Sequence, residues 1–291
     1  MKNEAFEKLI CEFGFDDFAV KISGSGGFTV VCIKAVEIFD DGAFECSIVP
    51  FYAMSQRGRD GFLGLLGNIN SIGFFAEPVE KGASLKQLAA ELGIGFIGLN
   101  TLCISEKYGS DFFICAFETD FPLEETNRRQ RGEGGCKNCG RCVKACPTDA
   151  IDGCGGFSRK KCLRNYMLSG QIVPESFREK MGKQLLGCKI CQDACPHNRT
   201  REVVSAPENM QELTKLIYLL DGETDPWHRQ RQELFGTNYM RRERMCAQAL
   251  IVAGNTKRRD LLCVIDGLAE SDNPAIAQHA KWAAEKIRRS C

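Results

Sequence analysis

The sequence lacks three features that would place it in a special class. Its 38 Lys and Arg residues balance 38 Asp and Glu residues, so the net charge is zero and no overall positive field attracts nucleic acid. No stretch offers the ~18 consecutive apolar residues of a membrane helix. The N-terminal residues mix charged and apolar side chains, without the apolar stretch of a signal peptide. We therefore expect a cytoplasmic protein that makes no membrane contact, and any nucleic-acid binding must come from a local patch.

Cysteine, by contrast, is abundant, with 17 residues in a chain of 291. A small secreted protein would use so many cysteines for disulfides, but this chain is large and shows no export signal. In a reducing compartment, clustered thiols are more typical of metal ligands. The spacing of the cysteines then indicates which metal they bind.

The first cysteine motif is C-x2-C-x2-C-x3-C-P, formed by Cys136, Cys139, Cys142 and Cys146 with Pro147. This is the run of bacterial two-cluster ferredoxins, in which the fourth cysteine binds the other cluster. Thiolates are soft ligands that suit iron, and a [4Fe–4S] cluster needs one at each of its four corners. The motif therefore predicts two adjacent clusters.

The second motif, Cys188, Cys191 and Cys195 with Pro196, lacks the first cysteine of the full run. Cys162 lies upstream and is the natural replacement. We expect one cluster to be held by the first three cysteines of the first motif and by Cys195. The other cluster then takes Cys146, Cys162, Cys188 and Cys191. This exchange of ligands brings the clusters close together and makes the module an electron conduit.

Two alternatives to iron stay open at this point. Zinc sites also use C-x2-C pairs, although not with a third cysteine at the same spacing followed by C-P. The thiols could also serve as small apolar core residues. Cys154, in a Gly-rich segment between the two motifs, is expected to be an exposed thiol outside both ligand sets.

The predicted fold class is α+β, in three parts. Residues 1–127 form an α/β domain, residues 128–200 the ferredoxin-type module, and residues 201–291 a helical tail. In the first part the pattern predicts helices near residues 6–13 and 85–92 and strands at residues 28–36 and 44–49. A strand pair is expected at residues 96–105 and 111–117, turned at 107–110. A polar, Arg- and Gly-rich linker is predicted at residues 124–135.

The tail carries apolar stripes with helical spacing. One stripe covers residues 261–268, and another covers residues 276–287. The second stripe follows an Asp-Asn-Pro sequence that is expected to cap and begin its helix. With a further helix near residues 241–252, these stripes indicate a short stack of HEAT-like helical repeats.

From about residue 88 onward the chain resembles the epoxyqueuosine reductases, a cobalamin-dependent family distantly related to reductive dehalogenases. The matching segments are short and occur in the same order. They are residues 93–101, 109–110, 145–151, 161–162 with Tyr166, 170–175, 187–198, 235–237, 253–255 and 279–283.

The resemblance implies a function. The N-terminal domain would hold a cobalamin beside the nearer cluster, with Gly95, Asn100 and Thr101 on the cobalamin side. Electrons from a flavodoxin- or ferredoxin-type donor would pass through two [4Fe–4S] clusters to cobalt, which would reduce an epoxide on a queuosine precursor in tRNA. Basic residues of the tail would contact tRNA phosphates: Arg241, Arg242, Arg244, Lys257, Arg258 and Arg259. The alternative for these side chains is a solvated helix face.

The chain departs from this family on the cofactor side. By counting, Val79 occupies the position of the family's presumed proton-donating aspartate, and Leu99 replaces a family lysine. Glu77 and Glu80 lie nearby and are the candidate proton donors, because a buried glutamate with a raised pKa acts as a general acid. The alternative is that both are plain surface carboxylates. The N-terminal region is also short, with only Tyr52 and residues 57–60 resembling the corresponding family segment.

Three functions therefore remain under consideration. The first is a cobalamin-dependent iron–sulfur reductase. The second is a non-catalytic [4Fe–4S] electron carrier or adaptor that lacks cobalamin chemistry. The third is a structural protein that uses its clusters as staples. The oligomeric state is not predicted.

Overall fold

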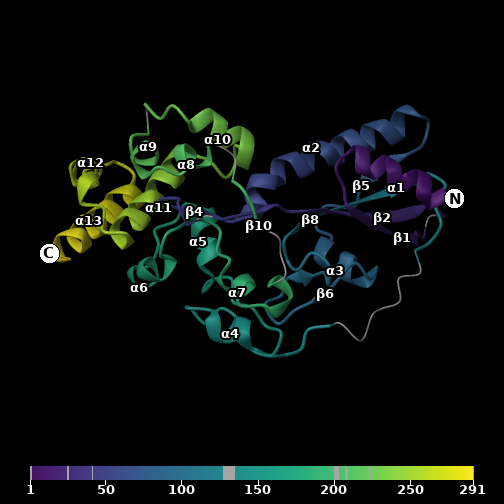
Figure 1. The fold of residues 1–291 in the computed structure, drawn as a ribbon, viewed down its shortest axis with the longest axis horizontal. Helices are drawn as coiled ribbons and strands as arrows, with labels where there is room; N and C mark the ends of the chain where they lie inside the picture. Colours follow the sequence, from purple (N-terminus) through teal and green to yellow (C-terminus); the bar gives the residue numbers. More distant parts are fainter. Residues whose placement is uncertain are drawn as a thin grey trace.

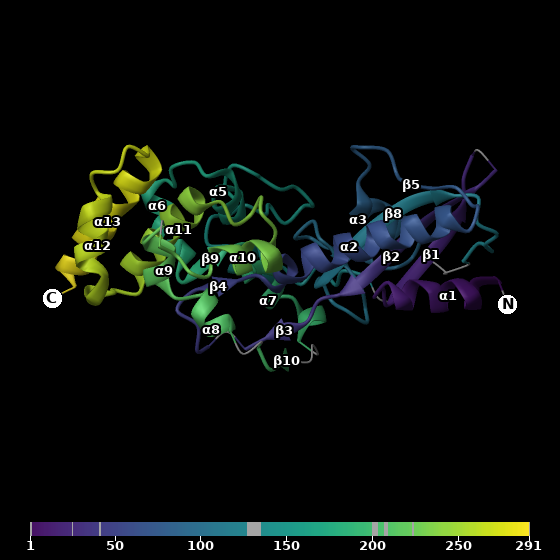
Figure 2. The ribbon, with the colours of Figure 1, turned by 90° about the horizontal axis from the view of Figure 1, so that it is seen from above.

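A computed structural model describes residues 2–24, 26–40, 42–126, 135–199, 203–206, 209–222 and 224–290. Figure 2 shows the N-terminal sheet and the C-terminal helices at opposite ends of an elongated molecule, with the cysteine-bearing segments between them. Most of the predicted linker, residues 127–134, lies outside the described residues. Among the helices described, none is long and apolar enough to cross a membrane.

A four-stranded antiparallel sheet forms the N-terminal part, in the order β1-β2-β8-β5. Its strands are β1 (Asp17–Ile22), β2 (Phe28–Ala35), β5 (Ala76–Pro78) and β8 (Phe112–Thr119). Alternate residues of the central strands point to opposite faces, so both faces are apolar and both are covered. Helices α1 (Lys2–Glu12) and α2 (Pro50–Ser71) cover one face, and α3 (Leu85–Glu91) covers the other (Figure 1).

Helix α2 is an element that the sequence patterns did not predict. Its interior carries glycines, which lower helix propensity. The glycines permit close packing instead: a Cβ on Gly61 would lie 2.4 Å from the carbonyl oxygen of Phe13, and one on Gly58 would lie 2.8 Å from the Phe113 ring. Proline at the first helical position fixes the start of the helix, since its φ is already helical.

The expected strand pair at residues 96–105 and 111–117 is wrong. Strand β6 (Phe96–Ile97) pairs instead with β7 (Cys103–Ile104) in a small hairpin of its own. Strand β8 lies between β2 and β5, because its side chains are needed on both faces of the main sheet. Only an isolated bridge between Ser105 and Gly109 remains at the predicted turn.

Short elements connect the sheet to the cysteine module. Strand β3 (Ile38–Phe39) pairs with β10 (Val203–Val204), and β4 (Ser47–Ile48) pairs with β9 (Gln184–Leu186). The predicted strand at residues 44–49 is therefore confirmed only at β4. The module itself contains α4 (Arg141–Ala145), α5 (Leu163–Ser169), α6 (Glu175–Arg178), η1 (Glu179–Met181), α7 (Ile190–Asp193) and η2 (Pro196–Asn198).

Helices make up most of the tail, as predicted. They are α8 (Met210–Leu213), α9 (Leu216–Leu220), α10 (His228–Phe235), α11 (Arg242–Asn255), η3 (Arg259–Leu261), α12 (Leu262–Leu268) and α13 (Pro274–Arg289). The predicted start of α13 is confirmed: the side chain of Asn273 accepts from the N–H groups of Ala275 and Ile276. The HEAT-like repeat stays a prediction.

One large core joins the tail to the module and to the segment before α2. It contains the buried residues Phe44, Cys46, Val49 and Tyr52 together with apolar side chains from α5 to α13. The predicted domain boundaries near residues 127 and 200 stay predictions.

His279 fastens α13 to two other elements inside this core. Its ring is fully buried, Nε2 accepts the N–H of Val173 at 3.1 Å, and Nδ1 donates to the carbonyl oxygen of Ala247 at 2.9 Å. Burial lowers the pKa of His279 to about 4, and the positive charge of Arg178 acts in the same direction. The neutral ring is thus part of the folded state.

We expect the free energy of unfolding to fall as the pH drops from 6.5 to 4. Above pH 6.5 His279 is neutral in both the folded and the unfolded state. Below pH 6.5 the unfolded chain binds a proton at His279, whereas the folded chain binds it only near pH 4. The titration of His279 alone then lowers the free energy of unfolding by up to ~3 kcal/mol. Urea titrations across this range should show a flatter dependence for His279→Gln. Equal slopes for the two proteins would contradict the assignment.

Candidate functional site

The eight motif cysteines come together in the central module. Cys136 and Cys139 precede α4, Cys142 lies within it, and Cys146 follows it. The other four are tied to the second half of the module. Cys162 precedes α5, Cys188 follows β9, Cys191 lies in α7, and Cys195 precedes η2.

The first group of cysteines comprises Cys136, Cys139, Cys142 and Cys195. The thiol of Cys142 lies close enough to Cys136 and Cys195 to feel their charges, and Cys195 likewise feels Cys136 and Cys139. Burial raises the pKa of both Cys142 and Cys195. Cys139 is exposed, so this group reaches the protein surface.

The second group comprises Cys146, Cys162, Cys188 and Cys191. All four line the wall of one cavity, and Cys191 also lies near Cys142 of the first group. Burial raises the pKa of Cys188 to about 11 and that of Cys191 to about 12. Each group thus takes one cysteine from the other motif, which is the arrangement that the ferredoxin spacing predicts. The role of these residues as cluster ligands stays a prediction.

The surroundings of the sulfur atoms suit thiolate ligands. The N–H of Ala150 donates to Cys146 Sγ at 3.3 Å. Such N–H bonds stabilise a thiolate but do not compensate for the burial of four negative charges. Iron does so, and hydrogen bonds to sulfur are the usual environment of iron–sulfur clusters. The donor set therefore fits two [4Fe–4S] clusters.

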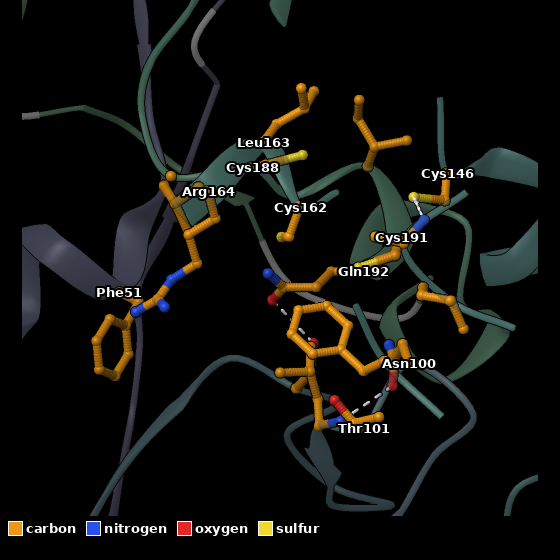
Figure 3. A pocket seen from close by; sticks show the side chains of 18 of the residues that line it. Phe51, Asn100, Thr101, Cys146, Cys162, Leu163, Arg164, Cys188, Cys191 and Gln192 are labelled. Atoms are coloured by element: carbon orange, nitrogen blue, oxygen red, sulfur yellow. Dashed lines mark hydrogen bonds between the residues drawn. The ribbon is translucent and has the colours of Figure 1, made fainter. Parts of the chain in front are cut away.

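A cavity of about 380 Å³ opens beside the second group. Figure 3 shows the four sulfur-bearing side chains on one side of it and Asn100 and Thr101 on the opposite side. The remaining wall is mainly apolar. Its apolar residues include Val49, Phe51, Leu102, Phe112, Ile114, Ile151, Phe157, Leu163 and Ile190. This volume lies within the range of sites for small molecules and cofactors.

The charged side chains among the described lining residues are two cations, Lys86 and Arg164, and no carboxylate is among them. Lys86 Nζ donates to the carbonyl oxygen of Thr101 at 2.7 Å, and Arg164 Nε donates to the Tyr52 hydroxyl at 2.7 Å. Burial raises the pKa of Tyr52, while Arg164 opposes this effect. Lys86 and Arg164 are therefore the charged groups that the described lining offers apart from its cysteines.

Of the residues that the sequence predicted on the cofactor side, some line the cavity and others do not. Asn100 and Thr101 line the cavity, whereas Gly95 does not. A Cβ on Gly95 would lie 2.5 Å from the carbonyl oxygen of Ile104, so this glycine serves the β6–β7 hairpin. Glu77 and Glu80 are exposed and lie outside the cavity lining. Their role as proton donors stays a prediction.

Sequence reasoning did not single out Lys86 or Arg164. Arg164 follows Cys162 by two positions, and this proximity to a ligand was the only signal in the sequence. Lys86 lies in α3, distant in sequence from every cysteine motif, so only the folded chain reveals its place at the cavity.

Asn198 holds the cysteine module against the N-terminal domain. Its Oδ1 accepts the N–H of Ser110 at 2.8 Å, and its Nδ2 donates to Ser110 Oγ at 2.9 Å and to the carbonyl oxygen of Gln192 at 2.7 Å. A Cβ on Gly109 would lie 2.0 Å from Asn198 Oδ1, and Gly109 has a φ of +62°. Only glycine therefore leaves room for this clamp.

The comparisons with known proteins agree with this geometry. A family model described as a 4Fe-4S double cluster binding domain matches residues 135–198. The epoxyqueuosine reductase of Lactococcus garvieae is 30% identical over 234 residues, which cover 78% of this chain and 64% of that relative. The chain thus spans less than two thirds of the relative's length.

Solved structures share the fold. The epoxyqueuosine reductase of Streptococcus thermophilus matches with a TM-score of 0.80 and 20% identity, covering 99% of this chain and 90% of that one. An epoxyqueuosine reductase solved with a tRNA stem loop carrying epoxyqueuosine matches with a TM-score of 0.75 and 20% identity. The match covers 99% of this chain and 91% of that one. The mixed α+β architecture of this chain is therefore that of these enzymes.

We expect Cys162→Ser to remove one cluster of the two. Cys162 completes the second group, and serine is a poor ligand for iron. Iron per chain in reconstituted protein should fall from about eight toward four, with absorption near 400 nm roughly halved. Cys154→Ser is the matched control, because Cys154 is exposed and lies outside both groups. Equal iron contents in the two variants would contradict the assignment of Cys162.

Asn198→Ala should destabilise the contact between the module and the N-terminal domain. The variant loses three hydrogen bonds and leaves the Ser110 N–H without its partner, at a cost of about 2–4 kcal/mol. Chemical denaturation should show this loss of stability. Asn3→Ala, which removes side-chain bonds to the exposed Glu124 backbone, should have a much smaller effect. Equal losses in both variants would contradict the clamp.

Proposed function

Because the chain is similar in sequence and fold to epoxyqueuosine reductases, we propose that it is an iron–sulfur reductase with cobalamin in its large cavity. Electrons would enter through the first cluster and reach the cavity through the second. The substrate would be an epoxide on a modified base of tRNA. The observation that carries this proposal is the shared wall between the apolar cavity and the second cysteine group.

The mainly apolar lining of the cavity supports the proposed cofactor. The cysteines occupy one side, and β8, the start of α2 and the segment around Phe157 supply most of the apolar wall, which Lys86 and Arg164 complete. Asn100 and Thr101, opposite the cysteines, would hold polar groups at the ring edge, as would Ser110. When bound, cobalamin would supply low-potential cobalt chemistry toward the epoxide carbon.

The proposed reaction needs two electrons and two protons. One C–O bond of the epoxide opens, the second C–O bond breaks, and the products are an alkene and one water molecule. The clusters deliver the electrons one at a time from a flavodoxin- or ferredoxin-type donor. Lys86 and Arg164 would stabilise the negative charge that develops on the leaving oxygen, because both are cations that line the cavity.

The source of the protons is a separate part of the proposal. Glu77 and Glu80 remain the carboxylates proposed from the sequence, although both lie outside the lining. Within the lining, hydroxyl groups belong to Tyr52, Thr101, Ser110 and Thr148. Protons can therefore reach the leaving oxygen from water through these hydroxyls.

The tail offers a surface for tRNA next to the cavity. The rings of Tyr52 and Tyr239 meet at 4.8 Å, so the start of α11 lies near the cavity wall, and Arg241 and Arg242 are exposed there. Phosphate contacts by these two residues would place the anticodon loop at the cavity. Arg258 is a weaker candidate, since it forms ion pairs with Glu45 and Asp260.

Corrinoid binding by the cluster-containing protein tests the proposal. We expect binding of cobalamin at micromolar concentration, and we expect Ile114→Trp to weaken it at least tenfold. Ile114 is a half-buried residue of the cavity wall, and excess bulk there costs about 1–3 kcal/mol. The control is Ile72→Trp, the same change at an exposed site at the end of α2.

Absence of any corrinoid binding in the wild-type protein with full iron content would overturn the cobalamin part of the proposal. The chain would then act as an electron carrier, with both clusters reduced reversibly and no reaction in the cavity.

A further inference from the structure

A second, smaller cavity lies beside the first cysteine group. Its wall combines the four cysteines of that group with residues 98–100, Ile104, and the segment Pro196–His197. Asn100 belongs to the walls of both cavities. The small cavity is thus the space around the first cluster, on the side that faces the β6–β7 hairpin.

Two buried nitrogen atoms on this wall have no hydrogen-bond partner. They are Nδ2 of Asn100 and Nε2 of His197. In the described part of the chain, Arg244 and Gln248 also have unpartnered buried side-chain atoms, and neither residue lines this cavity. A buried donor without a partner is destabilising, so native proteins keep few of them without a reason.

Both side chains are held in place by other contacts. The His197 ring lies edge-on to Phe96, with the two ring centroids 5.0 Å apart. The amide oxygen of Asn100 accepts the N–H of Leu102 at 3.3 Å, so the NH2 end is the one left without a partner. The orientation of each group is therefore fixed before any cluster bond forms.

We propose that His197 Nε2–H and Asn100 Nδ2–H donate hydrogen bonds to sulfur atoms of the first cluster and raise its reduction potential. The proposal rests on the ligand set given above for the proposed function. On reduction the cluster takes up one electron from the external donor, and its sulfurs become more negative. An N–H donor binds the reduced form more strongly, so it favours reduction. No proton is transferred, and no covalent bond changes.

This pair of donors makes the two clusters unequal. His197 lines only the small cavity, and the large cavity beside the second group has Asn100 as its one unpartnered buried nitrogen among the described residues. The first cluster, which reaches the surface at Cys139, would therefore hold the electron more tightly than the second. An electron would therefore stay on the first cluster until a bound acceptor in the large cavity makes transfer to the second cluster favourable.

The test is a redox titration of the cluster-containing protein, followed by electron paramagnetic resonance. His197→Phe keeps a ring against Phe96 but removes the donor. At a fixed potential we expect the ratio of reduced to oxidised first cluster to fall about tenfold, which corresponds to about 59 mV for a one-electron couple. His197→Gln, which restores an N–H donor, should recover part of the shift, and Asn100→Leu should shift the potential in the same direction.

Gln248→Met is the matched control. Gln248 is also buried and unpartnered, but it lies in α11 and outside both cavities. We expect its variant to leave both potentials unchanged. A shift as large as that of His197→Phe would mean that the loss of any buried polar group perturbs the clusters, and it would overturn the proposal.

A spectroscopic measurement on the wild-type protein covers the case in which His197→Phe loses iron. The chain has 3 histidines, and His197 is the one on the cavity wall. With 15N-histidine, the reduced first cluster should show a nitrogen hyperfine coupling that is absent without the label. Full iron content without this coupling, or with an unchanged potential in His197→Phe, would overturn the inference. Failure of corrinoid binding would instead affect only the proposed reaction.

Discussion

Two groups of four cysteines lie at neighbouring points of the module, and the rest of the molecule is arranged around them. Each group of four takes one cysteine from the other motif, so Cys146 and Cys195 tie the two halves of the module together. Neither half can complete a site alone. The chain between Pro147 and Gly187 therefore has to return to its starting point, and it does so through α5, α6 and β9. Gly187, directly before Cys188, has a φ of +81° and leaves room for Tyr52.

The large cavity is a consequence of this return path. One wall is the second cysteine group, and the facing wall belongs to the N-terminal domain, so the cavity exists only when the two parts are in register. Asn198 fixes that register by its bonds to Ser110. Tyr52 adds another connection between the parts, because it contacts Arg164 of the module and Tyr239 of the tail. Site geometry and domain contacts thus depend on the same few residues.

Sequence patterns located the elements that depend on local chemistry. The cysteine spacing predicted which sulfurs lie together, since cluster geometry restricts the gaps between ligands. The Asn273 cap predicted the start of α13. The patterns missed α2, because glycines lower helix propensity. These glycines are needed for close contact with Phe13 and Phe113, and such a tertiary contact cannot be read from the local sequence. For the same reason the cationic lining of Lys86 and Arg164 could not be predicted: a cavity wall joins residues that are distant in sequence.

The segment from Gly95 to Thr101 shows how one short hairpin can serve both cysteine groups. A Cβ on Gly95 would lie 2.5 Å from the carbonyl oxygen of Ile104, and one on Gly98 would lie 2.6 Å from the Ile104 side chain, so a larger residue would collide at either position. The hairpin is therefore thin enough for Asn100 to reach both cavities, with its oxygen fixed by Leu102. Thr101 follows with a φ of +62° and turns its neighbours toward the large cavity. A thin, rigid partition of this kind keeps the two spaces separate while leaving a single polar side chain in contact with both.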